Sequence, residues 1–120
     1  MKAIQLFLIF FYILDQSYEQ CKEDDLGGFL GAISPELWAD GVPMDKAIFN
    51  DWQRVCNPEM IDEKNILEKT YIFLDYYEKA FGFNFSKTKQ WIKIKSNEET
   101  VKRAFEQSQA MCQKFDYNNL

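Results

Sequence analysis

Apolar residues recur along this chain three and four positions apart, the spacing that places side chains on one face of an α-helix. Only Gln5 interrupts the apolar run from residue 3 to residue 14. A helix over residues 3–21 is therefore expected to be buried around most of its circumference, in a core or in an interface. Three further stripes predict helices: Ile48, Trp52 and Val55; Ile66, Thr70, Phe73, Leu74, Tyr77 and Phe81; and Val101, Ala104, Phe105, Ser108, Met111, Cys112 and Phe115.

Capping signals indicate where these helices begin and end. Asp45 is the expected N-cap of the third helix, and Asn57-Pro58 is expected to end it. Gly82 suits the position just after a helix, because glycine adopts the left-handed conformation without strain. Two pairs have capping-box spacing at the start of later helices, Asn65 with Glu68 and Ser96 with Glu99.

The segment from residue 22 to residue 45 carries turn signals. Asp24 is a plausible N-cap for a short helix through residues 26–30, but the glycines at 27, 28 and 31 weaken a helix. They suit either a turn or a helix against which another element packs closely. Residues 34–45 are expected to be a loop carrying Trp38, with a single turn opened by Ser34-Pro35.

Residues 83–95 allow two structures. Phe83 and Phe85 alternate with polar residues, which favours a small β-hairpin, whereas Ser86 is equally suited to cap a short helix. The whole pattern predicts a mainly α fold: one compact domain over residues 1–120, a bundle of four to five helices, with or without that hairpin.

Composition narrows the chemistry. Of the 120 residues, 47% are hydrophobic, and 11 Phe, 6 Tyr and 3 Trp are among them, so the chain can bury a core and is not expected to be disordered. The absence of histidine excludes Ser-His-Asp and Cys-His catalysis and imidazole-based zinc sites. No calcium-loop spacing is present, and a pair of carboxylates is too common among 19 acids to indicate a glycosidase. We therefore expect no catalytic residues, no metal and no cofactor.

The cysteines and the N-terminal segment indicate in which cellular compartment the protein is expected. Three cysteines without a CxxC pair favour reduced thiols in the cytoplasm, with Cys56 and Cys112 buried on helical faces. Lys2 followed by an apolar run resembles a signal peptide, but no small-x-small cleavage site follows it. The run is also too short to span a bilayer, which takes about 20 residues.

Charge is unevenly distributed along the chain. Residues 1–63 hold 12 acids and 4 bases, whereas residues 64–120 hold 7 acids and 10 bases. The net charge of −5 opposes binding to nucleic acid, so the lysines from Lys87 to Lys95, beside Trp91, are expected to form a solvated face rather than a single-strand binding site. The acids of the first half are either caps, turn residues and solubilising charges or a surface that attracts a basic partner.

Three pieces of residues 24–52 form a recognisable pattern: Asp24-Asp25-Leu26-Gly27-Gly28-Phe29-Leu30-Gly31; Asp40-Gly41-x-Pro43-x-Asp45-x-Ala47; and Asp51-Trp52. In spacing, this pattern resembles a family of small bacterial immunity proteins of contact-dependent growth inhibition and related polymorphic toxin systems. Phe29, Lys46 and Phe49 depart from the family pattern. The resemblance implies a cytoplasmic protein that binds a cognate toxin domain, often a nuclease, and blocks it.

Together these observations predict a binding protein rather than an enzyme. The expected partner is a basic toxin domain, with no direct contact to nucleic acid and no membrane span. The alternative is a small helical scaffold that homodimerises through the apolar N-terminal helix, which an exposed face of Phe7, Phe10, Phe11 and Ile13 would favour. The expected partner-binding residues are Glu23, Asp24, Asp25, Glu36, Trp38, Asp40 and Asp51, with Trp38 as the apolar anchor.

Overall fold

The computed structural model describes residues 1–37 and 45–115. It is mainly α, as the sequence predicts, but these residues form six α-helices rather than four or five. Short 3₁₀ turns follow the second and third helices. The elements are α1 (Ala3–Cys21), α2 (Asp24–Ile33), η1 (Pro35–Leu37), α3 (Lys46–Cys56), η2 (Pro58–Met60), α4 (Ile66–Phe81), α5 (Ser86–Ile94) and α6 (Glu98–Phe115).

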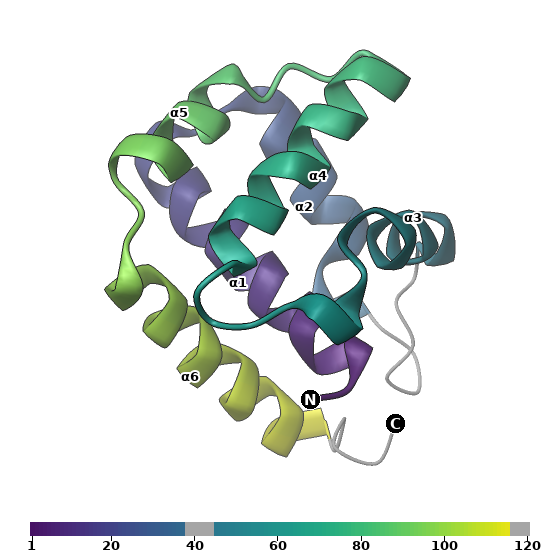
Figure 1. The fold of residues 1–120 in the computed structure, drawn as a ribbon, viewed down its shortest axis with the longest axis vertical. Coiled ribbons are helices and arrows are strands. Elements are labelled where there is room, and N and C mark those ends of the chain that lie inside the picture. Colours follow the sequence, from purple (N-terminus) through teal and green to yellow (C-terminus); the bar gives the residue numbers. More distant parts are fainter. Residues whose placement is uncertain (38–44, 116–120) are drawn as a thin grey trace.

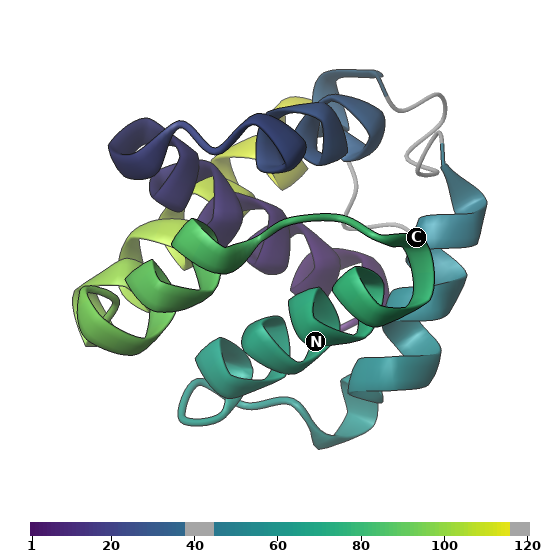
Figure 2. The same ribbon diagram turned by 90° about the horizontal axis from the view of Figure 1, so that it is seen from above.

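Helix α1 is the centre of the bundle. The other helices surround it in both views, with α6 packed along it (Figures 1 and 2). This position explains its nearly continuous apolar sequence, because every face meets another element. Phe7 and Ile13 have no exposed surface, and Phe10 and Phe11 are also buried. The chain itself therefore covers the face that a homodimer through this helix was expected to expose.

Aromatic rings join four helices in the core. The ring of Phe10 in α1 lies 5.4 Å from that of Phe73 in α4 and 6.4 Å from that of Phe29 in α2, both edge to face. Phe7 meets Trp52 of α3 edge to face at 5.1 Å. Such pairs contribute about 0.5–1.5 kcal/mol each beyond the area they bury, so this cluster holds α1 to α2, α3 and α4.

Two aromatic residues of the predicted stripes are not in this core. Phe81 at the end of α4 is 59% exposed, and Phe105 in α6 is 39% exposed. The stripe positions just before them, Tyr77 and Ala104, are buried as expected. Helical spacing therefore predicts which face of α4 and α6 packs on the core, but not how far along each helix that face stays buried.

The hairpin alternative for residues 83–95 is wrong, because Ser86–Ile94 form helix α5. Ser86 is the first residue of that helix rather than its cap, and the N-cap residue, Phe85, makes no side-chain capping bond. Within the described residues, no segment forms a β-strand. Carboxylates from other elements supply the missing capping interactions.

Among the other predicted caps, some are confirmed and some are displaced. Asp45 caps α3 by accepting a hydrogen bond from the backbone N–H of Ile48 at 3.0 Å. Gly82 ends α4 with a φ of +77°, as expected. The Asn65 and Ser96 boxes are wrong: Asn65 makes no side-chain capping bond to α4, and at α6 the box consists of Asn97 and Thr100.

Helix α2 forms despite its glycines, and its cap lies one residue earlier than expected, at Glu23. A Cβ atom on Gly27 would lie 3.0 Å from the ring of Tyr18, so α1 packs closely on α2 there. Added Cβ atoms at Gly28 and Gly31 would meet nothing within 4 Å. Close packing therefore explains only Gly27.

No helix in the described ranges, 1–37 and 45–115, is long and apolar enough to cross a membrane.

Candidate functional site

The seven predicted partner-binding residues do not share one structural role. Trp38 and Asp40 lie outside the described residues. Asp24 and Glu36 are exposed, and no hydrogen bond or ion pair joins either of them to another described residue. The other three, Glu23, Asp25 and Asp51, accept hydrogen bonds from within the chain.

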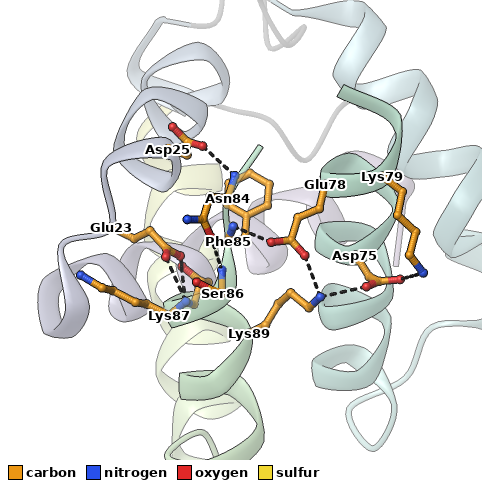
Figure 3. Close-up of polar contacts among 11 residues, drawn as sticks. Glu23, Asp25, Asp75, Glu78, Lys79, Asn84, Phe85, Ser86, Lys87 and Lys89 are labelled. Atoms are coloured by element: carbon orange, nitrogen blue, oxygen red, sulfur yellow. Dashed lines mark hydrogen bonds and ion pairs between the residues drawn. The ribbon is translucent and has the colours of Figure 1, made fainter. Parts of the chain in front are cut away.

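Glu23 is buried, with 6% of its surface exposed, and holds the first turn of α5. Its carboxylate accepts hydrogen bonds from the backbone N–H groups of Lys87 and Thr88, both at 2.9 Å, and from Thr88 Oγ1 at 2.8 Å (Figure 3). The first N–H groups of a helix have no partner inside it, and the helix dipole favours negative charge there. Glu23, more than 60 positions earlier in the chain, supplies both the hydrogen-bond acceptors and the negative charge.

Asp25 and Glu78 fix the residues that lead into α5. Asp25 accepts a hydrogen bond from the Asn84 N–H at 2.6 Å, and Glu78 accepts one from the Phe85 N–H at 2.7 Å (Figure 3). Together with Glu23, which precedes α2, three carboxylates therefore bind the N–H groups of residues 84, 85, 87 and 88. The Asn84 side chain accepts from the Ser86 N–H between them.

The side of α5 that faces α4 carries an ion-pair network. Lys89 Nζ lies 2.7 Å from Glu78 Oε1 and 2.8 Å from Asp75 Oδ1, and Lys79 also pairs with Asp75 at 2.8 Å. Hydrogen bonds from Lys79 and Lys89 lower the pKa of Asp75 to about 2. Hydrogen bonds to Asp75 and Glu78 raise the pKa of Lys89 above its usual range. This network fastens α5 to α4.

Asp51 is on α3, and its side chain contacts α4. Its carboxylate accepts a hydrogen bond from Tyr77 Oη at 2.8 Å and pairs with Arg54 at 3.2 Å. Arg54 also donates to Tyr76 Oη at 2.8 Å. Burial, and then the hydrogen bond to Asp51, raises the pKa of Tyr77 above its usual range. Asp51 thus joins two helices, in addition to any role it has at the surface.

The exposed acids Asp24 and Glu36 lie near the two ends of α2. Asp24 is the first residue of that helix, and Glu36 is in the turn η1 that follows it. Ten residues of α-helix span roughly 15 Å, so the two carboxylates flank a helix rather than form a pocket. The tertiary structure brings Glu23 and Asp25 together at α5 and places Asp51 on a different contact, with α4.

A second surface, which the sequence did not suggest, lies at the N-terminal end of α1. A groove of about 1230 Å³ opens between that end, the segment joining η2 to α4 and the start of α6. These three segments are at least 30 residues apart in the chain, so no local motif indicates the groove. We call it the η2–α6 groove.

In the described part of the chain, no three Cys, Asp or Glu residues are arranged to hold a metal ion. Comparison with protein-family models, curated proteins and solved structures finds no match to this chain.

Proposed function

We propose that this protein is a bacterial immunity protein that binds and neutralises a cognate toxin domain through a negatively charged surface. The observation that supports this proposal best is the pair of exposed carboxylates, Asp24 and Glu36, on either side of α2, neither of which pairs with another described residue. The same stretch of chain carries much of the pattern that resembles immunity proteins. Buried Glu23 and the bound Asp25 give this surface a rigid base at α5.

The electrostatic part of the mechanism follows from the expected partner. A nuclease toxin holds phosphates in a basic cleft, so an acidic surface is attracted to that cleft or to its rim. Complementary charge raises the association rate constant above the roughly 10⁵–10⁶ M⁻¹s⁻¹ of neutral partners, most strongly at low salt. Once bound, the protein excludes the nucleic-acid substrate from the cleft.

The homodimeric scaffold has less support. It depended on an apolar face of α1 at the surface, but Phe7, Phe10, Phe11 and Ile13 are each at most 7% exposed within one chain. A dimer through this face would have to open the core. No other observation in the described residues favours the scaffold over the immunity function.

The proposal predicts that a neighbouring reading frame encodes a protein with a C-terminal toxin domain, and the decisive test is co-expression with that domain. If the proposal is right, cells that express the toxin domain alone stop growing, and cells that also express this protein grow normally. A purified complex should then form with one-to-one stoichiometry. Continued growth arrest in the presence of this protein, at confirmed soluble expression, contradicts the proposal.

The contribution of the α2 surface is tested by charge reversal. The double variant Asp24→Lys/Glu36→Lys should slow association with the toxin domain by tenfold or more at low salt, because it reverses the charges that attract the partner. The matched control is Glu68→Lys/Glu106→Lys, which makes the same change in net charge at two exposed residues of α4 and α6. Equal slowing by both doubles would show that only net charge matters and would contradict the assigned surface.

A further inference from the structure

We propose that the η2–α6 groove binds a basic, amphipathic helical segment of a partner protein. The size of the groove, its apolar floor and its charged rim each restrict what it binds. The proposal concerns the chemistry of the occupant. It therefore does not depend on the immunity function, although a toxin domain is one protein that would supply such a segment.

The floor of the groove is apolar. Leu6 and Ile9 of α1 and Ile66 of α4 form its buried part. Around them the apolar surface reaches solvent: Met1 is 66% exposed and Phe105 of α6 is 39% exposed. The remaining apolar lining residues, all partly buried, are Pro58, Ile61, Leu67 and Val101. A contiguous apolar surface of this kind, rimmed by polar residues, is typical of an interaction site.

The rim is acidic. Its side chains include two lysines, Lys64 and Lys102, and five acids, so the side chains that line the groove carry a net charge of −3. Within ranges 1–37 and 45–115, none of these carboxylates forms an ion pair. The five acids are Glu59, Asp62, Glu63, Glu98 and Glu99.

Size and charge together select the occupant. Small-molecule sites measure about 300–1,000 Å³ and enclose their ligand, whereas this groove is larger, at about 1230 Å³, and partly open to solvent. An amphipathic helix places its apolar face on such a floor through residues at i, i+3, i+4 and i+7. Its flanking side chains then reach the rim, where lysine and arginine complement the five acids. An anionic membrane surface is disfavoured because the same acids repel it.

The proposal is tested by selection from a displayed library of random helical peptides of about 14 residues, roughly four turns. We expect enriched sequences to carry Leu, Ile, Phe or Met at helical spacing and a net positive charge. Their affinity should fall steeply as salt rises, because exposed charge pairs are screened. Enrichment of neutral or acidic sequences, or no enrichment above a library without target, would overturn the proposal.

The site of binding is tested with matched variants of the protein. Glu59→Lys/Glu63→Lys reverses two exposed rim charges, and Glu68→Lys/Glu106→Lys makes the same change in net charge outside the groove. The first double should weaken binding of the selected peptides at least tenfold, and the second by no more than about twofold. Melting temperatures of both variants show whether they remain folded. If Glu59→Lys/Glu63→Lys does not fold, Phe105→Ala replaces it.

A second copy of this chain is the competing occupant. Sedimentation over a range of concentrations measures self-association of the wild-type protein and of the groove double. A wild-type dimer that Glu59→Lys/Glu63→Lys dissociates would assign the groove to self-association and overturn the proposal of a separate partner. A monomer that binds basic amphipathic peptides supports the proposal, whether or not the co-expressed toxin domain is neutralised.

Discussion

Glu23 shows how a residue's role depends on what surrounds it. In the sequence it belongs to a run of three acids, Glu23, Asp24 and Asp25, and all three were expected to face a partner. In the structure Glu23 is 6% exposed and accepts three hydrogen bonds from α5, whereas Asp24 beside it is exposed. A buried carboxylate is tolerated only where hydrogen bonds replace the water it has lost.

We therefore predict that Glu23→Ala lowers the free energy of unfolding by about 2–4 kcal/mol, because it leaves the buried N–H of Thr88 and the part-buried N–H of Lys87 without a partner. The control, Asp24→Ala, should lose less than about 1 kcal/mol, the size of an exposed charge effect at a helix N-terminus. Urea denaturation followed by circular dichroism measures both values. Equal losses would mean that Glu23 does not hold α5.

At the scale of the element, α2 shows that three similar glycines have different environments. Gly27 faces Tyr18 of α1, with 3.0 Å available to an added Cβ, whereas Gly28 and Gly31 face open space. Glycine inside a helix is less favourable than alanine by about 1 kcal/mol, because its backbone is freer in the unfolded state. Only at Gly27 does close packing explain why the helix has glycine in place of the more stabilising alanine.

The matched pair Gly28→Ala and Gly27→Ala tests this difference. Gly28→Ala should raise the free energy of unfolding by about 0.5–1 kcal/mol, since its methyl group meets nothing within 4 Å. Gly27→Ala should show no such gain or a net loss, because the ring of Tyr18 must move. Thermal melts of the two variants compare them directly. A gain of the same size at both positions would show that α1 does not constrain Gly27.

Helix α5 could not be predicted from the residues within and next to it. Its sequence, Ser86–Ile94, permits a strand or a helix, and its only local cap candidate, Ser86, does not cap it. Glu23, which precedes α2, binds the N–H groups of Lys87 and Thr88 in the first turn of this helix. Carboxylates on α2 and α4 bind the N–H groups of the two residues before it. The spacing of residues within residues 83–95 contains no information about these distant partners.

At the scale of the whole molecule, the tight bundle protects its thiols unequally. Cys56 and Cys112 are buried, as the sequence predicts, and Cys21 is half-buried at the end of α1. Burial raises the pKa of Cys56 to about 12 and raises that of Cys112 as well. Because the thiolate is the reactive form, both buried thiols should react only when the fold opens.

We predict that iodoacetamide at pH 8 modifies Cys21 in the folded protein and reaches Cys56 and Cys112 only in concentrated guanidinium chloride. Above the ordinary thiol pKa of 9.0, the unfolded chain ionises Cys56 and the folded chain does not, so stability should fall between pH 9 and about 12. Mass spectrometry after timed labelling counts the modified sites. Rapid labelling of Cys56 under native conditions would show that the bundle is looser than described.

The groove is a property of the molecule as a whole. Its acids, Glu59 to Glu63 and Glu98 to Glu99, lie in two separate stretches of the sequence, one in each half of the chain. The division into an acidic first half and a basic second half therefore did not predict it. Phe105 belongs to a regular apolar stripe, and only the path of α1, α4 and α6 leaves it at a surface.

The sequence alone is enough to predict the mainly helical fold, the buried α1, the faces of α3, α4 and α6, and the ends at Asp45, Asn57 and Gly82. These features depend on periodicity and on residues a few positions apart, which local patterns record. Packing, in contrast, makes residues 86–94 a helix, buries Glu23 and brings three distant segments together around an acidic groove. Each of these depends on contacts across tens of residues, and such contacts form only when α1 and its neighbours pack.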